Sequence, residues 1–250
     1  MLVAALAVVV VLLGVIGVRV LLDRSGAPVD QGRLGTVLLV PGFGGSQTAL
    51  DQLADRVRAT GRTATVMTLP GDGTGDLIQQ ASALDAVARK ALDGGAPSVD
   101  VIGYSAGGVV ARIWVDRFDS AKLARRIVTL GSPLHGARVA GEGVALGGNA
   151  CPTACRQLAP GSGLLTQLDH ASLPRGLPWL SVWTENDETV QPPDSARLDG
   201  AVNVPLQSLC PDARVSHGQL PTDPRVTALV LGAVGVPALT APTGCARITP

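Results

Sequence analysis

The most constraining feature of this sequence is a glycine–X–serine–X–glycine motif at residues 103–107. The preceding residues 98–102 are rich in β-branched side chains, as in a buried strand, and residues 109–118 have the pattern of a helix. A strand that enters a helix through so tight a turn needs glycine on both sides of the central residue. The turn holds the Ser105 hydroxyl at the N-terminus of the helix, where the helix dipole and free N–H groups favour a developing anion. The motif therefore predicts a strand–turn–helix unit that carries a nucleophilic serine.

The alternation of strands and helices continues along the chain. Short apolar runs predict strands at residues 36–40, 64–69, 98–102, 126–130, 179–184 and 202–206. Apolar residues at helical spacing predict helices at residues 47–59, 76–92 and 109–118, and a final helix capped by Thr222 or Asp223. Strands and helices in this order predict an α/β protein with a mostly parallel central sheet and helices on both faces.

One long segment interrupts this alternation, at residues 136–176. It is rich in glycine, contains two of the cysteines and is too long for a simple connection. Long inserts in compact domains often form lids or substrate-binding loops. We therefore expect one domain over residues 36–250, with a lid-like insert at residues 136–176.

The composition limits the possible partners of this domain. Hydrophobic residues make up 46% of the chain but aromatic residues only 2%, so the core must consist mainly of alanine, valine and leucine. Twenty basic residues balance 20 acidic ones, and no basic patch with interleaved aromatic residues is present. The composition therefore argues against nucleic acid as a partner.

Residues 1–22 form a hydrophobic segment, and the polar residues 23–35 read as a linker. About 20 apolar residues span a bilayer, whereas the apolar part of a signal peptide usually has about 7–15. The segment therefore predicts a signal peptide or a membrane anchor, and the sequence leaves its cleavage open. Arg19 and Arg24 follow the apolar run and no basic residue precedes it, which favours a cytoplasmic location for the rest of the chain.

The four cysteines favour the opposite side of the membrane. Their even number and the absence of a Cys-X-X-Cys pair fit two disulfides better than a metal or redox site. The favoured pairing is Cys151 with Cys155, which lie close together in one loop, and Cys210 with Cys245. Four separate buried thiols are the alternative. We expect an extracytoplasmic domain that is either membrane-anchored or secreted.

A serine nucleophile needs a base to accept its proton and a third group to orient that base. The chain has three histidines. His217 follows a strand and an acidic turn and precedes the final helix, so we expect it to be the base for Ser105. His135 directly follows a predicted strand and is expected to have a structural role, while His170 reads as a surface residue of the insert.

The acid is expected in the turn that follows the strand at residues 179–184. Asp187 lies in the middle of this turn and is the favoured residue. Glu185, Glu188 and Asp194 are alternatives, and each of them can instead be a solvated loop charge.

Backbone N–H groups must stabilise the oxyanion of the tetrahedral intermediate. The residue after the nucleophile, Ala106, supplies one of them. The glycine-rich loop at residues 41–46 follows the first strand and can supply the second from Phe43. The alternative for Phe43 is a core side chain in a flexible turn.

Several motifs together resemble small bacterial α/β-hydrolase lipases of the class 2 kind, typified by minimal Bacillus lipases and their actinobacterial relatives. The matching segments are residues 40–45, 103–108, 131–136, 186–190, 198–204 and 216–218. The resemblance implies an α/β-hydrolase fold, a catalytic triad of Ser105, His217 and Asp187, and carboxylic esters such as acyl glycerols as substrates. It also implies an oxyanion hole made by the N–H groups of Phe43 and Ala106.

The chain departs from this family at several points. Pro41 stands where many relatives have histidine, and the hydrophobic N-terminus, the cysteines and the long insert are not found in the most minimal lipases. No metal or organic cofactor is implied by the motifs. Two rival hypotheses are acyl transfer to an envelope lipid or sugar by the same triad, and a non-catalytic scaffold on a hydrolase fold.

Overall fold

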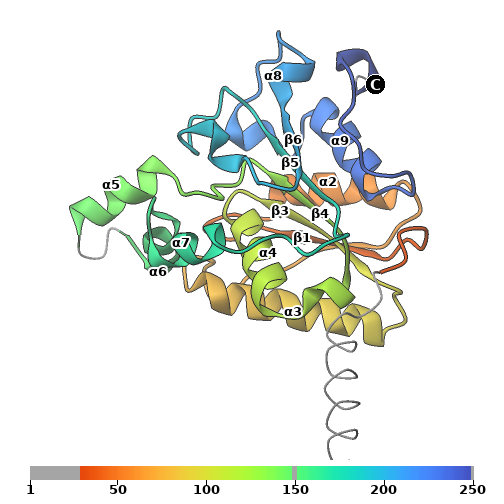
Figure 1. The fold of residues 1–250 in the computed structure, drawn as a ribbon, viewed down its shortest axis with the longest axis horizontal. Helices are drawn as coiled ribbons and strands as arrows, with labels where there is room; N and C mark the ends of the chain where they lie inside the picture. The colour runs from red at the N-terminus through yellow and green to blue at the C-terminus, as the bar shows by residue number, and fades with distance from the viewer. Residues whose placement is uncertain (1–28, 148–150, 249–250) are drawn as a thin grey trace, which may run out of the picture.

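The computed structural model describes residues 29–147 and 151–248. A six-stranded sheet forms its centre (Figure 1), with strand order β2-β1-β3-β4-β5-β6 and parallel pairing between all neighbours. The strands are β1 (Thr36–Val40), β2 (Ala64–Val66), β3 (Val99–Tyr104), β4 (Ala124–Leu130), β5 (Trp179–Trp183) and β6 (Val202–Pro205). The predicted parallel sheet is confirmed, although β2 is shorter and β4 begins earlier than the sequence pattern indicated.

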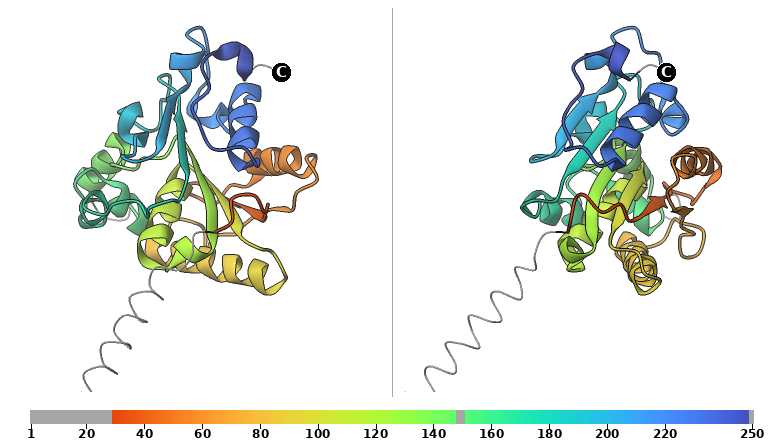
Figure 2. Two further views of the ribbon diagram at one scale, coloured as in Figure 1. Left: turned by 45° about the vertical axis from the view of Figure 1, so that its right-hand side comes forward. Right: turned by 90° about the vertical axis from the view of Figure 1, so that its right-hand side faces the viewer.

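Helices cover both faces of the sheet, as predicted. The main ones are α2 (Thr48–Arg58), α3 (Leu77–Asp93), α4 (Ala106–Arg117) and α9 (Pro224–Val234). Helices α3 and α4 pack on one face and α2 and α9 on the other, so that two separate apolar cores flank the sheet (Figure 2). Because all six strands are parallel, their carboxyl ends lie at the same edge of the sheet. Parallel α/β sheets bind their ligands at this edge.

The elements form where local chemistry favours them. All seven residues of β4 are buried, as expected for a strand covered on both faces. In α2 the buried residues Leu50, Leu53, Ala54 and Val57 recur at helical spacing. Helix α9 begins with Pro224, and the Asp223 side chain accepts hydrogen bonds from the first free backbone N–H groups.

The described part of the insert that the sequence predicted between β4 and β5, residues 136–147 and 151–176, contains three helices. They are α5 (Arg138–Leu146), α6 (Thr153–Leu158) and α7 (Gly163–Asp169). They lie together beyond the edge where the strands end, and α5 projects furthest from the sheet (Figure 1). The remaining short helices of the described residues are α8 (Leu206–Leu209) and the 3₁₀ turns Ser120–Lys122, Pro193–Ala196, His217–Gln219 and Cys245–Arg247.

The amino ends of β3 and β4 hold a buried group of charges that the sequence pattern did not predict. Oδ2 of Asp100 forms ion pairs with the guanidinium groups of Arg125 at 2.6 Å and Arg62 at 2.7 Å. Arg126 donates instead to backbone carbonyl oxygens, among them that of Ala233 at 2.6 Å in α9. We call Arg62, Asp100, Arg125 and Arg126 the arginine cluster. It joins β3 and β4 to the end of α9, on the sheet edge opposite the strands' carboxyl ends.

The second half of the predicted linker packs on this cluster. The Gln31 side chain donates to the carbonyl oxygen of Arg125 at 3.0 Å, and the Gln31 carbonyl oxygen accepts from the Arg125 guanidinium at 3.1 Å. The predicted signal or anchor segment, residues 1–22, lies outside the described residues. Among the helices of residues 29–147 and 151–248, none is both long and apolar enough to cross a membrane.

Candidate active site

Ser105 lies at the turn between β3 and α4, as the motif predicted. Its φ of 52° is in the left-handed region, which costs a non-glycine residue about 1–3 kcal/mol. Close backbone approaches hold this turn in place. A Cβ on Gly107 would lie 2.2 Å from the carbonyl oxygen of Val40, and one on Gly103 would lie 2.5 Å from Cα of Gly108. Any side chain at Gly103 or Gly107 would therefore clash with the neighbouring backbone.

The structure brings Ser105, His217 and Asp187 together in the order expected of a triad. Nε2 of His217 lies 3.0 Å from Oγ of Ser105, and Nδ1 of His217 lies 2.7 Å from Oδ2 of Asp187. His217 and Asp187 are 6% and 2% exposed, so water does not compete for their hydrogen bond. This geometry permits His217 to accept the proton of Ser105 while Asp187 orients the imidazole.

Backbone groups orient the acid. Oδ1 of Asp187 accepts hydrogen bonds from the N–H groups of Thr189 at 2.9 Å and Val190 at 2.7 Å, which leaves Oδ2 directed at His217. Of the alternative acids, Glu188 accepts from the backbone N–H of His217 at 3.0 Å, so it positions the histidine loop without touching the imidazole. Glu185 and Asp194 are exposed.

Further contacts join the acid turn to the segment that precedes His217. Thr184 donates its hydroxyl to the carbonyl oxygen of Val215 at 2.7 Å, and the Asn186 side chain donates to that of Ala213 at 3.1 Å. Gly131, at the end of β4, has a φ of 54°, and a Cβ there would lie 3.1 Å from Nδ1 of His217. These contacts were not foreseen, because the sequence does not show which loops meet.

The loop after β1 passes directly over the serine. A Cβ on Gly42 would lie 3.0 Å from Cβ of Ser105 and 3.5 Å from its Oγ, so this position must be glycine for the loop to approach. The backbone N–H groups of Phe43 and Ala106 make no hydrogen bond with any other described residue. Phe43 is 46% exposed, so the alternative of a core side chain is wrong. Both N–H groups remain available to a ligand beside Ser105.

Tyr104 is a neighbour of the site that the sequence analysis did not single out. Its ring centroid lies 5.2 Å from that of His217, and its hydroxyl donates to the His217 carbonyl oxygen at 3.3 Å. Burial, with the nearby charges of Asp187 and Glu188, raises the pKa of Tyr104 to about 12. Tyr104, which directly precedes Ser105, thus packs against the His217 imidazole as a neutral phenol.

The other two histidines lie apart from this constellation. Nδ1 of His135 is 2.8 Å from Oδ1 of Asp169 in α7, and its Nε2 is 3.0 Å from the carbonyl oxygen of Arg197. His135 and His170 line a different hollow, together with the buried Arg112. These contacts agree with a structural role for His135 and a surface position for His170.

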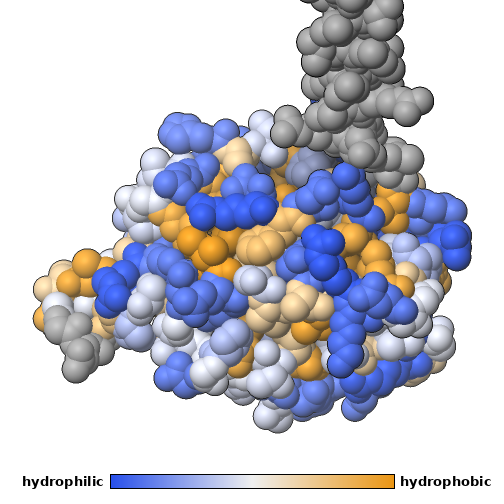
Figure 3. All heavy atoms as spheres, turned by 90° about the horizontal axis from the view of Figure 1, so that it is seen from below, coloured by the Kyte–Doolittle hydropathy of each residue, from blue (hydrophilic) through white to orange (hydrophobic). Residues whose placement is uncertain are grey.

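A cavity of about 480 Å³ opens from Ser105 into the insert. Ser105, Ala106 and Phe43 line it, and α5 and α6 contribute much of the remaining wall, with Glu142 as its charged residue. Figure 3 shows hydrophobic residues on the projecting part of the molecule formed by α5. Val139, Val144 and Leu146 of this helix are 56%, 43% and 81% exposed. The cavity can hold an extended apolar group attached to an atom at Ser105.

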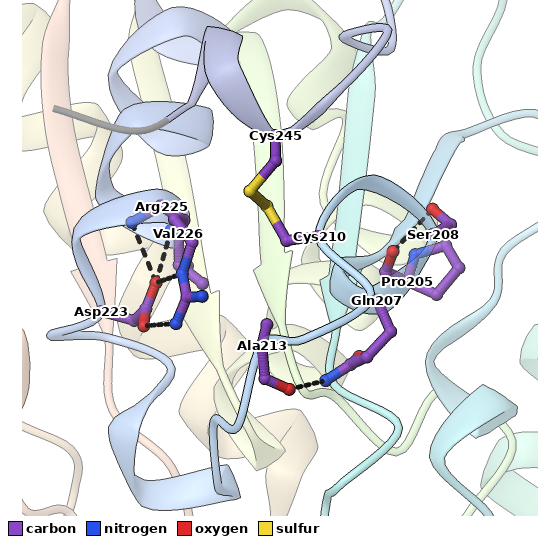
Figure 4. Close-up of a disulfide and its surroundings, with 9 residues drawn as sticks. All are labelled: Pro205, Gln207, Ser208, Cys210, Ala213, Asp223, Arg225, Val226 and Cys245. Carbon is purple, nitrogen blue, oxygen red and sulfur yellow. Dashed lines mark hydrogen bonds and ion pairs between the residues drawn. A yellow bond between two sulfur atoms is a disulfide. The ribbon is translucent and has the colours of Figure 1, made fainter.

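The cysteines pair in the structure as the sequence favoured. Cys151 bonds Cys155 in the insert, and Cys210 bonds Cys245. Figure 4 shows the second bond joining the end of α8 to the C-terminal 3₁₀ turn. Among the described residues no cysteine is free, and no cluster of His, Cys, Asp and Glu has the arrangement of a metal site.

Comparison with known proteins identifies the fold. No family model and no curated protein matches the chain. Lipase B from Aspergillus fumigatus superposes with a TM-score of 0.68 at 17% identity, over 83% of this chain and 54% of that one. The mature lipase of Bacillus licheniformis superposes with a TM-score of 0.56 at 19% identity, over 71% of this chain and 84% of that one.

A deformylase from Pseudomonas putida is also similar, with a TM-score of 0.53 at 17% identity over 82% of this chain and 93% of that one. The chain spans about half the length of the Aspergillus lipase, 54%. At such low identities the likeness establishes the architecture of the chain and not its substrate. With its parallel six-stranded sheet and helices on both faces, the chain has the α/β-hydrolase fold.

Proposed function

We propose that this protein is a serine hydrolase that cleaves carboxylic esters through an acyl-enzyme on Ser105. The observation that carries the proposal is the hydrogen-bonded chain from Ser105 through His217 to Asp187, with distances of 3.0 Å and 2.7 Å. The backbone N–H groups of Phe43 and Ala106, which bond no other described residue, line a largely apolar cavity of about 480 Å³ together with Ser105. These features support the assignment of Ser105 as nucleophile, His217 as base, Asp187 as orienting acid, the two N–H groups as oxyanion donors and the cavity as acyl site.

In the first half of the reaction, Nε2 of His217 accepts the hydroxyl proton while Oγ of Ser105 attacks the ester carbonyl carbon. The negative charge on the former carbonyl oxygen is stabilised by the N–H groups of Phe43 and Ala106. Asp187 stabilises the imidazolium that forms and keeps the tautomer with the proton on Nδ1. His217 then protonates the leaving alkoxide, and the alcohol departs.

In the second half, His217 accepts a proton from water, and the resulting hydroxide attacks the acyl carbonyl carbon. The same two N–H groups stabilise the second oxyanion. His217 returns the proton to Oγ of Ser105, and the carboxylic acid is released. Because the base serves both halves, substitution of His217 should block acylation and deacylation alike.

The apolar cavity supports esters with an aliphatic acyl chain, such as acyl glycerols and other lipid esters. Val139 and Leu146 of α5 are exposed apolar residues that also line this cavity, which supports a lid-like role for the insert at residues 136–176. The motif resemblance to class 2 bacterial lipases and the lipases among the similar structures support the same substrate class. We therefore propose a lipase or esterase of that kind.

We further propose that the domain is extracytoplasmic, and that residues 1–22 anchor it to a membrane or direct its secretion. Two disulfides support an oxidising compartment. The chain enters the domain at Gln31, beside the arginine cluster and the amino ends of β3 and β4. An anchor would thus join the domain at the sheet edge opposite Ser105.

The decisive experiment compares the full-length protein with the Ser105→Ala variant, both purified with their disulfides intact. We expect hydrolysis of p-nitrophenyl esters to fall by about 10⁴-fold or more in the variant, because the covalent route is lost. Covalent labelling by a fluorophosphonate should be lost with it. Equal activity in the two proteins would refute the role of Ser105.

The rival hypotheses give different results in the same experiment. An acyltransferase would react with the fluorophosphonate and release product only when an acceptor alcohol is added. A non-catalytic scaffold would show neither labelling nor turnover. Measurement of acid and of acyl-acceptor products separates these three outcomes.

A further inference from the structure

We propose that the Cys151–Cys155 disulfide determines the acyl-chain preference of the enzyme. The disulfide supports α5, and α5 forms part of the cavity wall. The inference rests on the proposed ester hydrolysis and names the part of the molecule that selects among esters. It concerns positioning residues: the sulfur atoms act through the helix packed on them and not on the reacting atoms.

Helix α5 has few anchoring contacts of its own. Ala140 is its buried residue, and Gly141 and Gly143 are half-buried, while the rest of the helix is exposed. A helix in water is normally held by an apolar stripe several side chains long. Here three small residues replace that stripe, so the position of α5 depends on the surface directly beneath them.

The disulfide provides that surface. Its two sulfur atoms lie 3.9 Å and 3.8 Å from the carbonyl oxygen of Ala140. A Cβ added to Gly143 would lie 3.0 Å from Sγ of Cys155 and 3.5 Å from Sγ of Cys151. The backbone of α5 therefore packs directly on the disulfide, and even a methyl group at position 143 would be a tighter contact than is usual for a Cβ.

The two helices that meet at this bond contribute much of the cavity wall. Val139, Ala140, Gly143 and Leu146 line the cavity from α5, and Cys155 and Leu158 line it from α6. Ser105, Phe43 and Ala106 line the same cavity. A short acyl group stays near Ser105, whereas a long one must extend along α5 and the disulfide. Displacement of α5 should therefore affect long acyl chains selectively.

The test uses two glycines of α5 that differ in what lies beneath them. In the full-length oxidised protein, the Cβ of Gly143→Ala would lie 3.0 Å from Sγ of Cys155, so α5 and the disulfide must move apart by a few tenths of an ångström. In Gly141→Ala, the added Cβ lies 3.6 Å from Cδ of Pro160, an ordinary contact. Both changes raise helix propensity equally. The readout is the ratio of kcat/KM for p-nitrophenyl decanoate to that for the acetate.

We expect Gly143→Ala to lower this ratio about tenfold, the scale of a misfitted methylene in an apolar pocket, chiefly through a higher KM for the decanoate. Gly141→Ala should leave the ratio at the wild-type value. The double variant Cys151→Ser/Cys155→Ser should lower the ratio as well, whereas Cys210→Ser/Cys245→Ser, which removes the distant disulfide, should not.

Equal ratios in Gly143→Ala and Gly141→Ala, or a wild-type ratio in the Cys151→Ser/Cys155→Ser variant, would overturn the inference. These results leave the proposed function intact as long as the wild-type protein hydrolyses the acetate and Ser105 reacts with a fluorophosphonate. A wild-type protein that fails both of those assays would refute the proposed function and this inference with it.

Discussion

Ser105 has an unfavourable positive φ, and contacts with neighbouring strands hold the backbone in this conformation. Its N–H donates to the carbonyl oxygen of Leu130 at 2.9 Å, and Gly107 packs on the backbone of Val40. The strain is thus held by the β1, β3 and β4 strands together. The hydroxyl remains half-buried and reaches both His217 and the cavity.

At the same scale, Tyr104 offers a direct measurement of the environment beside the base. It is the single tyrosine of the chain, so the ultraviolet absorbance of phenolate reports this residue without overlap. We expect a titration midpoint near pH 12 in the folded protein, against the ordinary 10.0 in the unfolded chain, because burial and the charges of Asp187 and Glu188 disfavour the phenolate. A midpoint near 10 under folding conditions would contradict this environment.

The raised pKa of Tyr104 also predicts how stability depends on alkaline pH. The unfolded chain loses the phenolic proton at lower pH than the folded one, so the unfolded state is favoured as pH rises. The contribution is complete below pH 10.0 and is lost as pH rises to about 12. Urea denaturation across this range should show a steeper loss in the wild type than in Tyr104→Phe.

At the scale of elements, the two disulfides differ in what they join. Cys151 and Cys155 are separated by 4 positions and close a short turn before and within α6. Cys210 and Cys245 are separated by 35 positions and tie the C-terminal segment to the end of α8 (Figure 4). The chain-entropy model ties the stabilising effect of a disulfide to the length of the loop it closes.

We therefore expect Cys210→Ser/Cys245→Ser to lower the free energy of unfolding by about 4 kcal/mol, and Cys151→Ser/Cys155→Ser by about 2 kcal/mol. Urea denaturation of the two double variants at neutral pH measures both values. The reverse order would mean that the short bond supports the global fold, and not mainly the local position of α5.

At the scale of the whole molecule, the arginine cluster joins segments far apart in sequence. Asp100 is the shared acidic partner of Arg62 and Arg125, and the side chains of Asp100 and Arg125 are fully buried. The carbonyl oxygens at the end of α9 accept further hydrogen bonds from Arg125 and Arg126. The negative end of the helix dipole thus complements the excess positive charge.

Removal of the central acid should destabilise the fold strongly. We expect Asp100→Asn to lower the free energy of unfolding by about 3–5 kcal/mol, because Arg125 would remain charged and buried with no acidic partner. Asp55→Asn removes the partner of Arg58 in an exposed pair and should change stability by less than about 1 kcal/mol. Chemical denaturation of both variants tests the contrast, and equal losses would refute the role of the cluster.

The parallel sheet and most of its helices were predictable from the sequence. Apolar residues recur at helical spacing in the helices and form short continuous runs in the buried strands. The strand predicted at residues 64–69 ends at Val66 in the structure, since sheet pairing and not propensity sets the length of β2. Ser105, Asp187 and His217 were predictable from their order and from the turns that hold them. The sequence suggested Glu188 only as an alternative acid of the triad. Its hydrogen bond with the backbone N–H of His217 could not be predicted, because no sequence pattern shows which loops lie side by side.

The sequence by itself determined the alternation of strands and helices, the tight turn at Ser105 and the residue types needed for nucleophile, base and acid. These follow from local sterics, capping and hydrophobic spacing, which act between neighbours in the chain. Tertiary structure alone decided which acid meets His217, that α5 rests on a disulfide, and that Asp100 joins two arginines. Such contacts depend on how separate loops and strands pack, and packing sums many weak interactions between residues far apart in sequence.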